Sequence, residues 1–275
     1  MIGTYVTKEQ VGCMKRIEEV APKVTSDLAD RIYDFWSRNV NCEHIMGKSL
    51  SDNVRGTEAY FKDLEKQRYR SHRHLLPWIK EMEPGRSVLE VGCGIGLDAF
   101  QMAKHGLKVT AVDLTDVAID TVRNRFKQNA LSGEFKVSDA TNLPFEENVF
   151  DYVYSFGVLH HAQDTAASIE EVYRVLKPGG EAKIMLYNRH SLNEVVHRIT
   201  KIPFEDKNEL CPVVRRYTVK EIKQIFSSFC DVRIKKEFVY GEGYGKLFKW
   251  TPYFLYKLLS TWWGWHLMIN AKKSV

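Results

Sequence analysis

The chain has 275 residues, of which 44% are apolar and 27% charged, and this ordinary globular composition excludes wholesale disorder. A chain of this length forms one or two domains and buries enough apolar surface to need no metal or disulfide staple. The formal net charge of +5 is too small for a protein whose main task is to coat nucleic acid.

The five cysteines are odd in number and scattered, and none forms a CxxC pair. Neither a zinc ribbon nor a disulfide framework is therefore expected, and no metal site is predicted. The first 25 residues lack the unbroken apolar segment of a signal peptide. These features predict a reduced, cytoplasmic location.

Residues 1–75 are predicted to form a polar helical lid, followed by one larger domain at 76–275. In the first helix, apolar side chains recur at i, i+4, i+7 and i+8 from Leu28, which places them on one face. Thr57 is expected to open a second, basic helix that runs to about Arg73.

From residue 86 onward, short apolar runs alternate with helical patterns of 10–15 residues. The strands are expected at 87–91, 107–112, 134–137, 149–155, 181–187, 232–240 and 266–272. This alternation predicts a parallel sheet with right-handed crossovers. Residues 190–217 and 240–264 break the pattern and are predicted to be insertions, the second of them rich in aromatic residues.

The first strand ends in a glycine-rich turn, VLEVGCGIG at 88–96. Without Cβ atoms, such a turn lets backbone N–H groups approach a ligand, and the helix that follows favours an anionic group. The glycines stand at offsets 0, 2 and 4, whereas the dinucleotide fingerprint has offsets 0, 2 and 5, so a nicotinamide oxidoreductase is disfavoured. Asp113 ends the second strand, 21 residues after Gly92, and is placed to bind ribose hydroxyls. Its alternative role is to cap the next helix, where Thr115 already offers a cap.

Five blocks of the chain resemble the class I S-adenosylmethionine-dependent methyltransferases, especially the small-molecule branch that includes ubiquinone- and menaquinone-type enzymes. The blocks are VLEVGCGIGLDA (88–99), VTAVDLT (109–115), SDATNLPF (138–145), FDYVYSFGVLHH (150–161) and RVLKPGGEAKIMLYNR (174–189). The resemblance spans residues 86–190. It implies a Rossmann-like, doubly wound α/β fold with a mostly parallel seven-stranded sheet, whose last strand is antiparallel and lies beside 232–240.

The resemblance also implies how S-adenosylmethionine would bind and leave as S-adenosylhomocysteine. Glu90, Gly92 and Gly94 would hold its aminoacyl end, and Asp113 its ribose. The remaining cofactor residues implied are Leu114, Asp139 and Ala140 at the adenine, Ser155 and Phe156 at the sulfonium, and Tyr60, Arg68 and Tyr69 of the lid at the carboxylate.

The acceptor is expected at the carboxyl edge of the sheet, where open parallel sheets bind ligands. His160 is the main candidate base, followed by His161 and Tyr187, because a hydroxyl acceptor needs a base more than an amine or a thiolate does. Candidate acceptor-binding residues are Arg189, Asn188 and Tyr244. For each histidine and for Arg189 the alternative is a purely structural hydrogen bond or surface ion pair.

Methylation of DNA bases is not expected, because Ser155-Phe156-Gly157-Val158 stands where such enzymes carry an acidic-or-Asn, Pro, Pro, aromatic tetrapeptide. The predicted function is methyl transfer to a small-molecule hydroxyl, thiol or amine. The alternatives are a non-catalytic cofactor-binding scaffold and a lipid or quinone methyltransferase working at the membrane surface. The aromatic insertion correspondingly predicts the wall of an apolar acceptor site, membrane contact through 252–269, or a homodimer interface.

Overall fold

The structure is a computed structural model that describes residues 26–40, 44–45, 48–49, 51–201, 211–241 and 244–275. Expectations for residues 1–25, which include Cys13, and for Cys42 lie outside the described residues.

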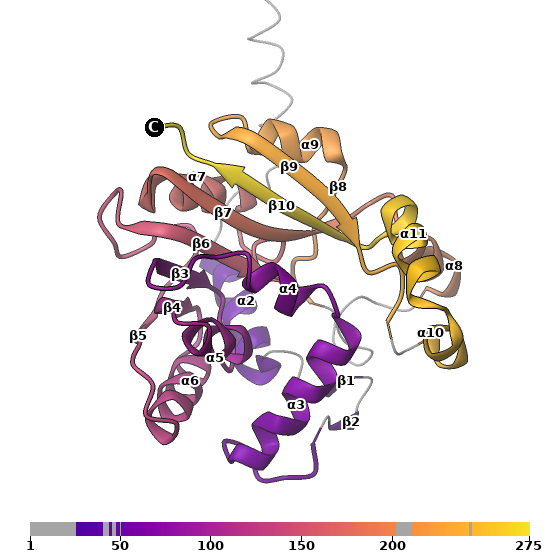
Figure 1. Cartoon of the computed structure of the whole chain (residues 1–275), viewed down its shortest axis with the longest axis horizontal. Helices are drawn as coiled ribbons and strands as arrows, with labels where there is room; N and C mark the ends of the chain where they lie inside the picture. Colours follow the sequence, from indigo (N-terminus) through magenta and orange to yellow (C-terminus); the bar gives the residue numbers. More distant parts are fainter. Residues whose placement is uncertain (1–25, 41–43, 46–47, 50, 202–210, 242–243) are drawn as a thin grey trace, which may run out of the picture.

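A twisted sheet of eight strands forms the centre of the molecule (Figure 1). Its strands are β3 (Ser87–Val91), β4 (Lys108–Asp113), β5 (Glu134–Val137), β6 (Phe150–Phe156), β7 (Leu176–Asn188), β8 (Arg216–Tyr217), β9 (Cys230–Glu237) and β10 (His266–Lys272). Their order is β5-β4-β3-β6-β7-β10-β9, with β8 beside β7. Strands β3 to β7 are parallel, and β10 runs antiparallel to both β7 and β9. The predicted fold is therefore confirmed, while the two-residue strand β8 is too short to leave a sequence pattern.

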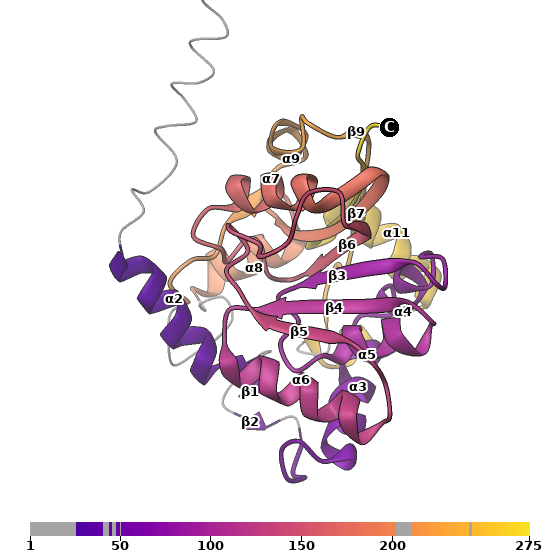
Figure 2. The same cartoon turned by 90° about the vertical axis from the view of Figure 1, so that its left-hand side faces the viewer.

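Helices cover both faces of the sheet, as a doubly wound fold requires (Figure 2). The helices after residue 70 are α4 (Leu75–Ile79), α5 (Leu97–Lys104), α6 (Asp116–Gln128), α7 (Thr165–Val175), α8 (Leu192–Thr200), α9 (Val219–Ile225), α10 (Lys246–Trp250) and α11 (Tyr253–Trp263). Helices α4, α5 and α6 pack with one set of alternating strand residues, and α7 and α9 pack with the other set. Successive side chains of each strand point to opposite faces of the sheet, so the apolar ones contribute to two separate core layers, one on each face.

The N-terminal segment consists of α2 (Ser26–Arg38), the short strands β1 (His44–Ile45) and β2 (Lys48–Ser49), and α3 (Glu58–Ser71). As expected, Thr57 caps α3, and its side chain accepts a hydrogen bond from the Tyr60 backbone N–H. Tyr60, Phe61 and Leu64 of α3 are buried against Ile95 and Leu97 of the glycine turn and its helix. The segment therefore lies over the turn that the sequence singles out, which is where a lid would have to be.

A buried ion pair joins this segment to the domain core. The Arg125 guanidinium of α6 donates to Glu65 of α3 at 2.7 Å and to the Gly96 carbonyl oxygen at 3.0 Å. It also lies 3.9 Å from the centre of the Phe100 ring. Burial lowers the pKa of Arg125, and Glu65 counters this effect by favouring the charged form.

The 252–269 stretch is divided between α11 and β10, so it does not form one continuous apolar helix. In the part of the chain that the structure describes, every helix is too short or too polar to cross a bilayer. The insertion at 240–264 contains α10 and α11, and the insertion at 190–217 contains α8 and β8.

Replacing Glu65 with alanine is expected to lower the free energy of unfolding by about 2–3 kcal/mol, because it leaves the buried Arg125 cation without its carboxylate. Urea denaturation with an unchanged m-value would measure the loss. Glu58→Ala is the matched control on the same helix, since Glu58 pairs only with the exposed Lys62. Equal losses in the two variants would contradict a special role for the Glu65–Arg125 pair.

Candidate active site

The glycine turn after β3 has a backbone that only glycine tolerates. Gly92, Gly94 and Gly96 have φ angles of 78°, 52° and 75°. A Cβ atom on Gly92 would lie 2.3 Å from Val158 Cγ1, and one on Gly96 would lie 2.2 Å from Val122 Cγ2. The turn therefore packs closely against side chains behind it, and its backbone is held at the start of α5.

Glu90 lies at the end of β3, buried beneath this turn. The Ala99 backbone N–H donates to its carboxyl group, but Oε2 has no hydrogen-bond partner among the described residues. Burial, and next the charge of Asp98, raise the pKa of Glu90 well above its ordinary value. A buried polar atom without a partner is costly, and an ammonium group is the partner that such a carboxylate favours.

Asp113 ends β4 and holds the turn from the neighbouring strand. Its carboxylate accepts hydrogen bonds from the Gly94 backbone N–H at 2.9 Å and from the N–H and hydroxyl of Thr115, both at 3.0 Å. Burial raises the pKa of Asp113, and these hydrogen bonds oppose the rise. Thr115 stands at the N-cap of α6 but makes no side-chain cap bond, so the expected cap is wrong: its hydroxyl serves Asp113 instead.

The predicted adenine and sulfonium residues lie along the same carboxyl edge of the sheet. Leu114, Asp139 and Ala140 are half-buried, and Asp139 accepts from the N–H and hydroxyl of Thr141, both at 2.8 Å. The Ser155 hydroxyl is buried and donates to the Val91 carbonyl oxygen at 2.8 Å. Ser155 therefore links β6 to β3, while the neighbouring Phe156 is only partly buried.

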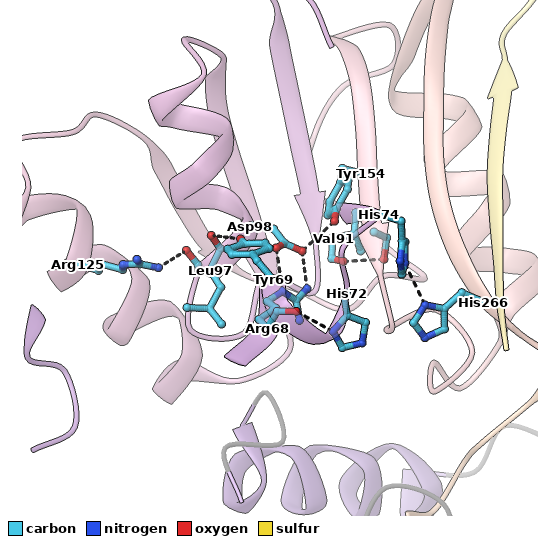
Figure 3. Close-up of polar contacts among 12 residues, drawn as sticks. Arg68, Tyr69, His72, His74, Val91, Leu97, Asp98, Arg125, Tyr154 and His266 are labelled. Atoms are coloured by element: carbon cyan, nitrogen blue, oxygen red, sulfur yellow. Dashed lines mark hydrogen bonds and ion pairs between the residues drawn. The ribbon is translucent and has the colours of Figure 1, made fainter. Parts of the chain in front are cut away.

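Asp98, which the sequence interpretation did not select, is the centre of a buried polar network (Figure 3). Arg68 donates to it through two nitrogens, at 2.9 and 2.5 Å, and the hydroxyls of Tyr69 and Tyr154 donate at 2.9 and 2.8 Å. Burial alone would raise the pKa of Asp98, but the Arg68 charge and these hydrogen bonds lower it. The sequence does contain a signal that could have identified Asp98: it is an acidic residue between apolar ones, in LDAF at 97–100, at the start of a buried helix.

Arg68 and Tyr69 are thus beside the glycine turn, as the lid prediction requires, but in this structure they contact Asp98 and the Leu97 carbonyl oxygen. Tyr60 lies deeper, in the apolar contact between α3 and the turn. The Arg68 guanidinium also lies 5.2 Å from the centre of the Phe156 ring, so the network reaches the predicted sulfonium side.

Next to Phe156 is a cluster of rings that the sequence did not reveal, here called the imidazole cluster: His72, His74, Phe238 and His266. The rings of Phe238 and His266 are stacked at 4.5 Å, and His72 stacks on Phe238 at 4.7 Å. His266 Nδ1 and His74 Nε2 are 3.2 Å apart and share a hydrogen bond (Figure 3). Burial, and next the neighbouring histidine, lower the pKa of His74 and of His266 well below the ordinary value, so both rings are neutral.

The predicted bases adjoin this cluster. His160 is fully buried, with its ring centre 3.8 Å from that of Tyr187 and 4.2 Å from that of His161. Neither ring nitrogen of His160 has a hydrogen-bond partner among the described residues, and burial lowers its pKa well below the ordinary value. His161 Nδ1–H donates to the Val213 carbonyl oxygen at 2.7 Å. Tyr187 is opposite His266 in the strand register, which brings the two groups of rings together.

The three predicted acceptor-binding residues all have partners within the chain. Arg189 donates to Glu221 at 3.0 Å and to the Arg216 carbonyl oxygen at 2.8 Å. The buried Asn188 amide donates to the carbonyl oxygens of His190 and Gly264. The Tyr244 hydroxyl donates to Asn193 at 3.0 Å. These contacts join the two insertions to the end of β7.

Known proteins that are similar to this chain in sequence are methyltransferases. Residues 89–184 match the family model described as a methyltransferase domain. The chain is 32% identical over 158 residues to cycloartenol-C-24-methyltransferase 1 of Oryza sativa subsp. japonica, covering 56% of the chain and 42% of that protein. It is 28% identical over 174 residues to 2-methyl-6-phytyl-1,4-hydroquinone methyltransferase of Synechocystis, covering 62% of the chain and 54% of that protein.

Among solved structures, phosphoethanolamine N-methyltransferase 2 of Haemonchus contortus, in complex with S-adenosyl-L-methionine, is similar with a TM-score of 0.58 at 20% identity. The similarity covers 92% of the chain and 61% of that protein, and it shows a shared fold. The chain spans about half or less of the length of the two relatives matched by sequence. The chain contains a methyltransferase domain, which confirms the resemblance to class I S-adenosylmethionine-dependent methyltransferases predicted from its sequence.

Proposed function

We propose that this protein transfers a methyl group from S-adenosylmethionine to a small, largely apolar acceptor. The observation that carries the proposal is the meeting of the glycine turn with two buried carboxylates, one of which, Glu90, has an oxygen without a partner. This arrangement fits an amino-acid-tipped nucleoside: an ammonium would satisfy Glu90, and a ribose would use the remaining acceptor capacity of Asp113.

When bound, the cofactor supplies an electrophilic methyl group on a sulfonium. The chain must align the acceptor with that methyl group and keep water away, and alignment alone is worth about 7–11 kcal/mol. Phe156 is the predicted neighbour of the sulfonium, and the Arg68–Phe156 contact ties the N-terminal segment to this point. A segment held in this way excludes water from the donor side.

The imidazole cluster supports an acceptor with a neutral, aromatic or apolar body and a hydroxyl group. Its rings are flat and at least partly buried, which suits apolar surface, while His160 and the hydrogen-bonded pair of His74 and His266 offer proton acceptors. Arg189, the expected anchor for an anionic acceptor, pairs with Glu221. A sterol-like or hydroquinone-like acceptor, as in the names of two relatives, therefore fits better than a phosphorylated amine.

A cofactor-binding scaffold without catalysis is the second candidate function. The intact carboxylates at 90, 113 and 139 would serve it equally well. Against it stands His160, because a buried ring with two unpartnered nitrogens lowers stability without any structural return. The homodimer alternative, the cytoplasmic location and the assignment of residues 1–75 as a lid stay predictions.

Asp113→Ala is expected to weaken binding of S-adenosylhomocysteine roughly 10- to 100-fold, since it removes hydrogen bonds to a charged acceptor. Isothermal titration calorimetry with S-adenosylhomocysteine, S-adenosylmethionine and NAD measures the effect. Asp120→Ala is the control, because Asp120 lies exposed on α6 and pairs only with Arg123. Binding of NAD without binding of either sulfur compound would refute the assignment.

His160→Phe is expected to lower turnover by about 10²-fold while the affinity for S-adenosylhomocysteine stays within twofold, because the ring acts on the acceptor's proton. Turnover is measured as transfer of labelled methyl to a panel of phenols, hydroquinones, sterols, thiols and amines. His190→Ala, an exposed histidine after β7, is the control. Label in no product, from protein that still binds the cofactor, would favour the scaffold.

Stability is expected to fall as the pH drops below about 6.5. His74, His160 and His266 have lowered pKa values in the folded chain, so the unfolded chain takes up protons first. Each such group contributes up to about 1.4 kcal/mol per pH unit until its folded pKa is reached. Urea unfolding between about pH 8 and pH 5.5 should show the slope, and His266→Phe should reduce it. An unchanged slope in that variant would contradict this reasoning.

A further inference from the structure

The second insertion presents an apolar ridge to solvent. On α11, Phe254, Leu258 and Trp262 recur every fourth residue and are 76%, 55% and 65% exposed, while Tyr256 and Ser260 on the opposite side are buried. On α10, Trp250 is 76% exposed. A soluble protein rarely leaves so many large aromatic side chains together in water, so the ridge indicates a surface that is covered in use.

Helix α8 begins on the inner side of α10 and α11. Leu192 at the start of α8 packs with the inner side of α10 and α11, in the cluster formed by Val239, Tyr240 and Tyr256. Farther along α8, Val195 and Ile199 are exposed one turn apart. Figure 1 shows α8, α10 and α11 together at one end of the molecule. The docking surface is defined here as the exposed side chains of α10 and α11: Trp250, Phe254, Leu258 and Trp262.

The charged residues on α10 and α11 themselves are all basic. Residues 244–263 contain three lysines and no aspartate or glutamate. Lys246 and Lys249 are exposed on α10, and Lys257 pairs with Glu237. Arg73 lies over the Phe248 and Tyr253 rings at 5.3 and 5.8 Å, and Arg198 is at the α8 edge. Aromatic and aliphatic side chains bordered by basic ones match an anionic bilayer, where rings enter the headgroup boundary and cations meet phosphates.

This charge pattern argues against a second copy of the chain as the occupant. A two-fold interface places the same surface on both sides, so Lys246 and Lys249 would approach a surface that carries the same lysines and no carboxylate from 244–263. Like charges brought together in this way oppose association. An anionic lipid surface has the opposite sign and needs no matching shape.

The docking surface is connected to the proposed acceptor site. Helix α11 is followed by its C-cap residue, Gly264. The next residue, Trp265, stacks on Tyr187, and the one after it, His266, belongs to the imidazole cluster. A Cβ atom on Gly264 would lie 2.5 Å from the Ser260 and Glu237 carbonyl oxygens, so this junction is closely packed. A bilayer under α11 would thus lie next to the site where an apolar acceptor must enter.

We propose that α10 and α11 dock this protein on an anionic lipid bilayer, with the α11 ridge in the headgroup boundary. The proposal narrows the expected membrane contact at 252–269 to α11 and its neighbours, because residues 266–269 lie in β10 and are buried. It goes beyond the proposed methyl transfer and does not depend on which acceptor is used.

The test is sedimentation of the full chain with vesicles of phosphatidylcholine alone and of phosphatidylcholine mixed with phosphatidylglycerol, at low and high salt. Binding to the mixed vesicles is expected, weakened by salt, with a blue shift of tryptophan fluorescence. Phe254→Gln with Trp262→Gln should reduce binding at least about tenfold. Lys246→Gln with Lys249→Gln should remove much of the preference for anionic vesicles.

Val54→Gln with Val137→Gln is the matched control, because these side chains are exposed and apolar but lie outside the docking surface. Calorimetry with S-adenosylhomocysteine and a thermal melt check that each variant is folded. Retained cofactor binding without any vesicle binding would overturn this proposal and leave the proposed function intact. Equal binding to neutral and anionic vesicles would overturn the electrostatic part, and a stable dimer that fails to bind vesicles would assign the surface to a second copy.

Discussion

One buried carboxylate, that of Asp98, joins parts of the chain that are far apart in sequence. It accepts hydrogen bonds from α3 through Arg68 and Tyr69, and from β6 through Tyr154. A buried charge is tolerated only when its partners are in place, so this group sets the position of α3 against the glycine turn. Removal of the Asp98 carboxylate would take a shared acceptor from all three donors at once, which makes the network behave as a unit. The burial of Tyr60 on Ile95 and Leu97 supports the same arrangement with apolar contact.

Most of the domain was predictable from sequence because its signals are local. Alternating apolar strands, helix caps such as Thr57, and the glycine turn each act within a few residues. The insertion of β10 between β7 and β9 is not local, and it came from family resemblance rather than from periodicity. Strand β8 escaped prediction because two residues show no alternation. Thr115 was misjudged because its side chain is turned to donate to the Asp113 carboxylate, and its oxygen accepts no hydrogen bond from the first turn of α6.

The residues of the candidate site also fall into those that a local motif indicates and those that only the folded chain brings together. Residues within one motif, such as Glu90, Gly92 and Asp113, were identified because a short strand-turn-helix unit fixes them together. Asp98 and the imidazole cluster were missed because their partners come from α3, β6, β9 and β10, and only the folded chain brings them together. Arg189 shows the converse: its sequence neighbourhood indicated a ligand contact, but Glu221 lies close enough to pair with it. Tertiary proximity therefore decides roles that sequence spacing leaves open.

The position of β10 has a consequence for how the chain acquires its structure. In chain order β10 follows β9, yet in the sheet it separates β9 from β7. Until β10 is made, most of the β7 edge beyond its short pairing with β8 is open, and β9 has no neighbour among the described strands, so both pairings of β10 must wait during synthesis on the ribosome. Open strand edges invite pairing with other chains. A nascent chain of this design is therefore most vulnerable to aggregation just before its final strand emerges, and early termination there would remove an inner strand of the sheet.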